Sequence, residues 1–234
     1  MEAKVAALNE KFQDCPPAEL LSWFVSEYHG KIAFSTSLGA EDQVITHLLS
    51  ACKTGVSIFS LDTGRLFQET YDLMQVTRQK YDIDIDICFP DALHVENMVN
   101  SLGINLFYES IENRRLCCHI RKKEPLTRAL AGKEVWITGM RREQSVTRAQ
   151  ARMIEWDPSL EIMKVNPLID WSDGHVWQYI RDHKIPVNEL HGKGFPSIGC
   201  LPCTRAVQPG EDVRSGRWWW ESPQFKECGL HTKG

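Results

Sequence analysis

The sequence predicts an α/β fold, a three-layer, mostly parallel twisted sheet with an irregular carboxy-terminal tail. Short apolar stretches alternate along the chain with amphipathic stretches of helical period, and this alternation is typical of parallel sheets covered by helices on both faces. After about Cys200 the pattern changes to Gly, Pro, Arg and Trp with no clear strand, which predicts the tail. We expect a single domain over residues 1–234, with a mobile tail at about 205–234.

The first two predicted strands are each followed by a turn and a helix. Residues 31–35 ("KIAFS") are mostly apolar, small residues follow, and an amphipathic helix begins at about Glu41. The stretch "VSIFSL" (residues 56–61) predicts the second strand, with a turn at Asp62–Gly64 and a helix after it. The repetition indicates two βα units placed one after the other.

The later elements are less regular. Residues 82–90 ("DIDIDICFP") alternate acidic and apolar side chains, which predicts a third strand near an edge of the sheet. The stretch "EVWIT" predicts a fourth strand that ends at Gly139 and leads into an arginine-rich loop. Ser172 precedes the helical pattern "DGHVWQYIRDH" and is expected to cap that helix.

Charge and composition exclude several classes of protein. The formal net charge is −4, whereas general nucleic-acid binders and membrane-surface proteins need a basic field over a broad face. The first fifteen residues contain no apolar segment behind a basic start, so no secretory signal is expected. No apolar run approaches the roughly 20 residues of a membrane span. We therefore expect a soluble, cytoplasmic protein without nucleic-acid or membrane partners.

Three loops at the predicted carboxyl ends of strands carry groups suited to an anion, and ligands of open α/β sheets bind beyond those ends. They are "STSLGAED" (Ser35–Asp42), "LDTGR" (Leu61–Arg65) and "GMRREQSVTRA" (Gly139–Ala149). Hydroxyls, a helix amino terminus and arginine forks all bind phosphate or sulfate oxygens. Each loop alone also fits an ordinary turn or a solvated helix face, but together they favour a nucleotide-like anion. The candidate residues are Ser35, Ser37, Gly39, Asp62, Thr63, Gly64, Arg141 and Arg148.

Eight cysteines in an intracellular chain are better interpreted as metal ligands or reactive thiols than as a disulfide framework. Cys15, Cys52 and Cys88 stand alone and are expected to be small buried hydrophobes. Cys200-Leu-Pro-Cys203 lies on a Gly/Pro turn, and two such thiolates commonly share one metal centre. The adjacent pair Cys117 and Cys118 can supply two further ligands, so the set suits tetrahedral zinc or an iron–sulfur cluster; a redox dithiol is the alternative.

Cys228 lies in the stretch "FKECGLH", between Lys226 and His231. Nearby cations lower the pKa of a thiol, and the thiolate is the nucleophilic form. A lone terminal cysteine is ordinarily incidental. Here arginine and tryptophan residues accumulate just upstream, which favours a nucleophile that a mobile tail carries to a substrate and then to a partner.

The sequence resembles the assimilatory adenylyl-sulfate (APS) reductases, in the family that also contains the 3′-phosphoadenylyl-sulfate (PAPS) reductases. The resemblance covers nearly the whole chain and is carried by the stretches "AFSTSLGAED", "LDTGRLFQETY", "CCHIRKKEPLTRAL", "WITGMRREQSVTRA", "GCLPC" and "ECGLH". The cysteine quartet marks the iron–sulfur branch, because PAPS-specific members generally lack it. The resemblance implies a Rossmann-like sheet of the adenine-nucleotide alpha-hydrolase type.

The resemblance also implies chemistry for particular residues. One [4Fe–4S] cluster per chain is expected on Cys117, Cys118, Cys200 and Cys203, and the phosphosulfate oxygens of APS are expected on Ser37, Lys122, Arg148, Arg214 and Arg217. The Cys228 thiolate is expected to attack the sulfur and expel AMP, with assistance from His231. Thioredoxin or a glutaredoxin-like donor is expected to release sulfite from the S-sulfocysteine intermediate. The resemblance further implies a homo-oligomer.

One departure bears on the alternatives. Related ATP pyrophosphatases have a glycine-rich loop that ends in an Asp-Ser pair, whereas Asp42 is followed here by Gln43. This counts against ATP cleavage, and with the acidic net charge it counts against an ATP-dependent tRNA sulfur-transfer enzyme. A PAPS reductase, or an enzyme that uses both nucleotides, stays open because a basic residue such as Arg65 could accept a 3′-phosphate. A zinc-stapled nucleotide-binding regulator is the non-enzymatic alternative.

Overall fold

The computed structural model describes residues 1–52, 55–145 and 148–222, and these form two compact units. The first unit contains the described residues of Met1–Ser60, Glu69–Asp86 and Gly132–Asn188. The second contains Leu61–Gln68, Ile87–Ala131 and the described residues from Glu189 onward. The single domain over residues 1–234 therefore stays a prediction.

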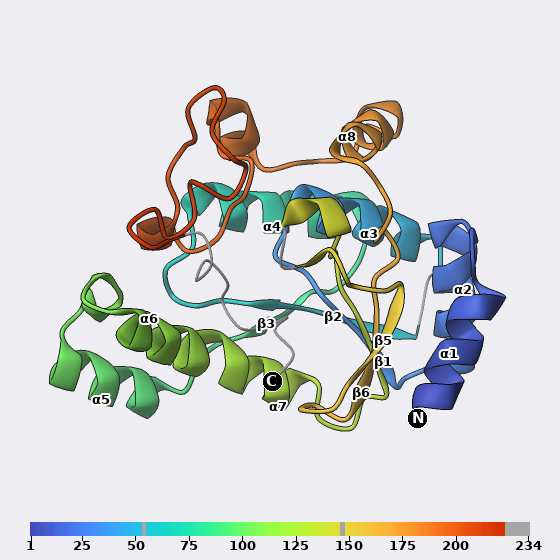
Figure 1. Cartoon of the computed structure of the whole chain (residues 1–234), viewed down its shortest axis with the longest axis horizontal. Coiled ribbons are helices and arrows are strands. Elements are labelled where there is room, and N and C mark those ends of the chain that lie inside the picture. The colour runs from blue at the N-terminus through green and yellow to red at the C-terminus, as the bar shows by residue number, and fades with distance from the viewer. Residues whose placement is uncertain (53–54, 146–147, 223–234) are drawn as a thin grey trace. The chain divides into compact units, whose positions relative to one another are not determined.

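The predicted α/β fold with a mostly parallel sheet is confirmed (Figure 1). The strands are β1 (Ile32–Ser35), β2 (Val56–Leu61), β3 (Asp86–Cys88), β4 (Val135–Ile137), β5 (Ile154–Asp157) and β6 (Ile162–Val165). They form one six-stranded sheet in the order β3-β2-β1-β4-β6-β5. Strand β1 pairs in parallel with β2 and β4, β4 pairs in parallel with β6, and β5 is antiparallel to β6. Ile32, Ala33 and Phe34 of β1 are fully buried, as expected for a central strand.

The helices alternate with the strands as the sequence pattern predicts. They are α1 (Glu2–Lys11), α2 (Pro17–Glu27), α3 (Ala40–Ser50), α4 (Gln68–Tyr81), α5 (Ala92–Leu102), α6 (Ile111–Cys118), α7 (Glu124–Ala129) and α8 (Asp173–Asp182). Within the first unit α8 packs on α3 (Figure 1). Ser172 caps α8, because its hydroxyl oxygen accepts a hydrogen bond of 3.1 Å from the N–H of His175.

The edges of the sheet differ from the sequence pattern. Strand β3 lies at one edge as predicted but covers only residues 86–88, because α4 runs to Tyr81 and Asp82 adopts a positive φ of 50°. Strands β5 and β6 form a hairpin that the sequence analysis did not anticipate. The carboxylate of Asp157 accepts hydrogen bonds from the N–H groups of Ser159 and Leu160, which fixes the turn between them.

None of the helices in the described ranges is long and apolar enough to cross a membrane. From Cys200 to residue 222 the chain is irregular, as expected. A short 3₁₀ turn covers Leu201–Cys203, and a single β-bridge joins Thr204 to Arg217.

Candidate functional site

The candidate site of the second unit is built on the helix that carries the adjacent cysteines. Helix α6 ends at Cys118 and continues through a π-helical turn, His119–Lys123, into α7. Pro125 has no backbone N–H, and its ring crowds the carbonyl of the residue four positions earlier, which is Arg121. We attribute the wider π turn to this proline, and such turns are frequent at functional sites.

Four cysteines and four basic residues line one cavity of about 20 Å³ in this unit, which is room for about one water molecule. Residues four apart lie on the same face of a helix. Arg121 therefore lies on the same face as Cys117, and Arg114 and Lys122 lie one turn before and one turn after Cys118. The second cysteine pair comes from the 3₁₀ turn at Leu201–Cys203. The lining residues are Arg65, Phe107, Arg114, Cys117, Cys118, Arg121, Lys122, Cys200, Pro202 and Cys203.

The turn "LDTGR" holds the second cysteine pair in place. The Asp62 carboxylate accepts a hydrogen bond of 2.7 Å from the N–H of Gly64, whose φ of +70° suits glycine. The Thr63 hydroxyl lies 3.2 Å from the Cys200 sulfur, and the Arg65 carbonyl accepts a 2.8 Å hydrogen bond from the residue after Cys200. Asp62 and Thr63 are buried, so both side chains form the turn and support the thiols.

The cavity separates the thiols by acidity. Burial alone raises the pKa of Cys200, but the positive charge of Lys122 and the hydrogen bond from Thr63 lower it below its ordinary value. Burial, and then the charge of Cys200, raise the pKa of Cys203 to about 12. Burial likewise raises the pKa of Cys117. Cys200 is therefore the thiol of these three that ionises first, and further thiolates need additional positive charge.

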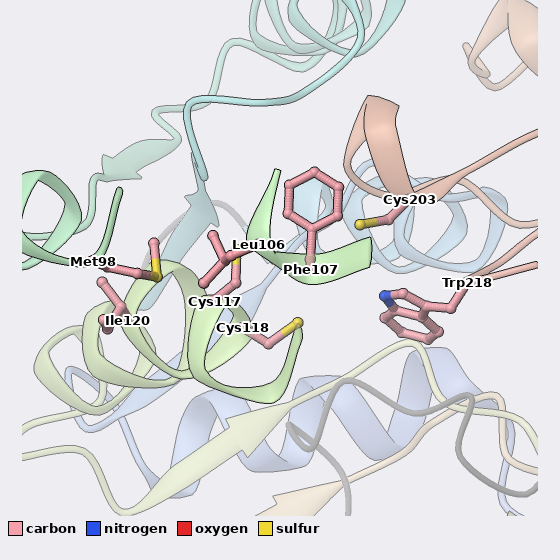
Figure 2. Packing of buried hydrophobic residues seen from close by; sticks show 8 residues of the cluster. All are labelled: Met98, Leu106, Phe107, Cys117, Cys118, Ile120, Cys203 and Trp218. Carbon is pink, nitrogen blue, oxygen red and sulfur yellow. The ribbon is translucent and has the colours of Figure 1, made fainter. Parts of the chain in front are cut away.

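The surroundings of the thiols also fit an anionic or metal-containing group. Three buried N–H donors of this unit have no hydrogen-bond acceptor within the part of the chain that the structure describes, namely Arg121 Nε, Arg217 Nε and Trp218 Nε1. Figure 2 shows the indole nitrogen of Trp218 on the side of its ring that faces the sulfur atoms of Cys118 and Cys203. Buried N–H groups ordinarily have partners, so these donors are available to an acceptor outside the described residues.

The thiol donors are of the right kind and number for a tetrahedral metal or an iron–sulfur cluster, with neighbouring cations to balance thiolate charge. Among residues 1–52, 55–145 and 148–222, however, no group of three or more histidine, cysteine or acidic side chains lies close enough together to hold a metal ion as it stands. The donor set fits such a group, and binding requires the thiols to turn toward a common centre.

Arginines gather around Trp218, which is almost fully buried. The guanidinium carbons of Arg114, Arg214 and Arg217 lie 4.9, 5.8 and 4.7 Å from the centre of its ring. Arg217 also donates a 3.2 Å hydrogen bond to the carbonyl of Ile198. These contacts place two of the predicted anion ligands, Arg214 and Arg217, together in the second unit with Lys122, Thr63 and the cysteine quartet.

In the first unit the carboxylate of Asp42 accepts the hydrogen bonds that the loop between β1 and α3 could otherwise donate to an anion. The N–H and the hydroxyl of Ser37 both donate to the carboxylate of Asp42, each at 2.6 Å. Burial raises the pKa of Asp42 to about 6, although the hydrogen bonds from Ser37 oppose the shift. Gly39 precedes α3 as its N-cap. An anion that bound to Ser37 would have to displace this carboxylate or meet it protonated.

The other predicted ligands of the first unit also have partners. Arg141 is buried and pairs with Glu41 at 2.8 Å and Asp173 at 3.2 Å, and it donates to the carbonyl of Trp171. The Ser35 hydroxyl accepts a 2.8 Å hydrogen bond from the indole of Trp136. Arg148 donates to the side chain of Gln144. In this structure these groups hold loops and strands together, and their role as anion ligands stays a prediction.

Cys228 and His231 lie outside the described residues, so their predicted roles rest on the sequence. Four buried residues of the second unit were not among the residues predicted from the sequence, namely Arg114, Arg121, Trp218 and Glu221. For the first two a signal was present, because Arg114 lies four residues before Cys118 and Arg121 lies four residues after Cys117.

The chain is similar in sequence to proteins of one known family. A model of the phosphoadenosine phosphosulfate reductase domain matches residues 31–206. The chain belongs to this family. It is 50% identical over 215 residues to adenosine 5′-phosphosulfate reductase of Allochromatium vinosum, covering 92% of this chain and 84% of that protein. It is 51% identical to adenosine 5′-phosphosulfate reductase of Burkholderia cepacia, covering 88% and 83% of the two chains.

A solved structure of the family agrees with the fold. Phosphoadenylyl-sulfate reductase from Candida auris, in a phosphate complex, superposes with a TM-score of 0.75 at 29% identity, covering 88% of this chain and 98% of that one. Yeast FAD synthetase has a TM-score of 0.57 at 16% identity over 86% and 68% of the two chains, which is a likeness of fold alone. The family resemblance seen in the sequence is therefore confirmed.

Proposed function

We propose that this chain reduces adenosine 5′-phosphosulfate (APS) to sulfite and AMP in the cytoplasmic assimilation of sulfate. The observation that carries the proposal is the cavity in which four thiols meet four basic side chains, Arg65, Arg114, Arg121 and Lys122. A site for an anionic phosphosulfate anhydride needs cations, and four clustered thiols suit a metal centre. The relatives at about half identity, which are adenosine 5′-phosphosulfate reductases, support the choice of substrate.

The proposed reaction has two halves. The Cys228 thiolate attacks the sulfur of the sulfuryl group; a sulfur–sulfur bond forms, the bond to the phosphate oxygen breaks, and AMP leaves. A thiolate of a thioredoxin-type dithiol protein then attacks the Cys228 sulfur and expels sulfite with the bonding electron pair. The second donor thiol releases Cys228 from the mixed disulfide, so the donor loses two electrons and becomes a disulfide.

Basic side chains assist the first half of the reaction. Negative charge shifts onto the AMP phosphate as the bond to sulfur breaks, and fixed cations stabilise that charge. The residues proposed for this role are Lys122, whose charge acts on Cys200, and Arg217, which lies over the ring of Trp218 together with Arg214. Assistance from His231 in forming the Cys228 thiolate belongs to the same proposal.

We also propose that Cys117, Cys118, Cys200 and Cys203 hold a [4Fe–4S] cluster. The fourfold thiol set, the positive charge around Cys200 and the indole N–H of Trp218, which has no acceptor among the described residues, support it. When bound, the cluster supplies an electrostatic and structural centre, and the reducing electrons of the reaction come from the donor thiols.

The test is the mass of anaerobically purified protein after incubation with APS in the absence of thiols, followed by peptide mapping. We expect a gain of one sulfonate group on the peptide that contains Cys228, reversed by reduced thioredoxin with release of sulfite. The C228S variant should form no adduct, whereas the matched control C15S should react like the wild type. No adduct on a protein shown to bind APS would overturn the proposal.

One alternative substrate is favoured by a specific observation, because the solved relative from Candida auris is a phosphoadenylyl-sulfate reductase. The same incubation with PAPS distinguishes the two. We expect adduct formation from APS at concentrations where PAPS gives little, and the reverse order would make this chain a PAPS reductase.

A further inference from the structure

Arg114 and Glu221 form the most enclosed ion pair described in the second unit. The Nε and Nη2 atoms of Arg114 donate to the two carboxylate oxygens of Glu221 at 2.9 and 2.7 Å. The side chains are only 1% and 3% exposed. A two-pronged pair of this kind fixes both groups in direction as well as distance. Neither charge can be left unpaired at such burial without a large cost, so the pair holds as a unit.

The pair joins two parts of the chain that are far apart in sequence. Arg114 is on α6, one turn before Cys118, and a side-chain hydrogen bond also links it to that thiol. Its guanidinium covers the face of Trp218, whose backbone N–H donates to the carbonyl of Cys203 at 3.1 Å. The carbonyl of Trp218 in turn accepts a 2.8 Å hydrogen bond from the N–H of Glu221. One arginine thus contacts both a quartet cysteine and the segment 218–221.

Glu221 precedes Cys228 by seven residues. A fully extended chain covers at most about 3.6 Å per residue, so Cys228 can lie no farther than about 25 Å from Glu221. We propose that the Arg114–Glu221 pair is the anchor from which the segment bearing Cys228 starts, and that Arg114 is a positioning residue for sulfur transfer. This inference rests on the proposed function, because it assigns the anchor to the cysteine that attacks APS.

The expected effect is larger than a change of tether length. The described contact before Glu221 is the backbone link between Cys203 and Trp218, three residues earlier. Lengthening a chain connection from about seven to about ten residues changes an effective concentration only about two-fold. Loss of direction costs more, since a misplacement of about 1 Å can slow a reaction roughly 100-fold. We therefore expect a loss of about ten-fold or more in the rate of adduct formation.

The test compares two double variants. R114M/E221L replaces both charges by apolar side chains of similar size, which avoids an unpaired buried charge and favours folding. The control R205M/E211L removes another two-pronged pair described in this unit, in which Arg205 contacts Glu211 at 3.0 Å from each of two nitrogens. That pair joins residues only six apart, and none of its described hydrogen bonds reaches α6 or the quartet. The single variant E221Q keeps the shape and one acceptor and should give an intermediate rate.

Two readouts are needed. The first is single-turnover formation of the Cys228 adduct at saturating APS, together with the dissociation constant for APS and the iron content. We expect R114M/E221L to slow the reaction at least ten-fold beyond any change that APS affinity or iron content accounts for, with the control unchanged. A rate within two-fold of the wild type, or a loss that only follows APS affinity or iron, would overturn the positioning role.

The second readout does not depend on catalysis. Limited trypsin digestion should cut after Arg217 at least ten-fold faster in R114M/E221L than in the wild type and the control. Equal rates of cutting would refute the anchor itself. If wild-type protein forms no adduct at all, the proposed function fails, and the digestion still decides whether the anchor exists.

Discussion

Gly199 is the position where one added methyl group tests the candidate site most directly. A Cβ atom at this glycine would lie 2.2 Å from Nη2 of Arg217, 2.5 Å from its Cζ and 2.7 Å from its Nη1. The backbone of Gly199 is not in the left-handed region, so alanine brings no conformational strain of its own. The nearest group that the added methyl of G199A meets is therefore the guanidinium of Arg217.

The displacement can be read from these distances. Ordinary van der Waals contact begins at 3.4 Å, so the guanidinium must retreat by about 1.2 Å. Arg217 is buried and lies 4.7 Å from the ring centre of Trp218, so it cannot simply move into solvent. A shift of this size in a substrate-positioning group corresponds to a loss of roughly 100-fold in kcat/KM, or about 3 kcal/mol.

The assay is sulfite release with APS and reduced thioredoxin, measured over a range of APS concentrations. The control is G192A, in the same unit, where an added Cβ has nothing within 4 Å and the glycine φ is not positive. We expect G192A to match the wild type and G199A to lose most of its kcat/KM with a melting temperature within a few degrees. A G199A enzyme with kcat/KM within three-fold of the wild type would show that the guanidinium of Arg217 does not position the substrate.

Three further outcomes are expected. The folded pKa of Asp42, about 6, exceeds its unfolded value of 3.8, so its contribution to stability is lost as pH rises through 6. Relative to D42N, the wild type should lose about 2 kcal/mol between pH 4 and 7 in urea unfolding, and parallel profiles would contradict the burial argument. S172A should lower the unfolding free energy by about 1 kcal/mol through loss of the α8 cap, and an unchanged urea midpoint would mean the cap contributes nothing. C203S should lose its iron by elemental analysis while C15S retains it, and full iron in C203S would mean a different ligand set.

The sequence alone determined the parts of the protein that depend on local pattern. The period of the apolar residues predicted β1, α3 and the parallel arrangement, because burial of one face follows directly from side-chain spacing. Ser172 predicted the start of α8, because the side chain of an N-cap residue accepts a hydrogen bond from a backbone N–H only three residues away. The cysteine motifs are also recognisable from short stretches of sequence. Their resemblance to a known family indicated the candidate reaction without any knowledge of the tertiary structure.

Other features depend on residues distant in the chain, and only the tertiary structure decided them. Arg141 has the sequence context of an anion ligand, yet in the folded chain it forms ion pairs with Glu41 and Asp173. Its charge is balanced by these two carboxylates, and in this structure it holds their segments together. The pairing of Arg114 with Glu221 spans 107 residues. No local pattern encodes such a partner, because a buried charge is satisfied by whichever opposite charge the packing brings to it.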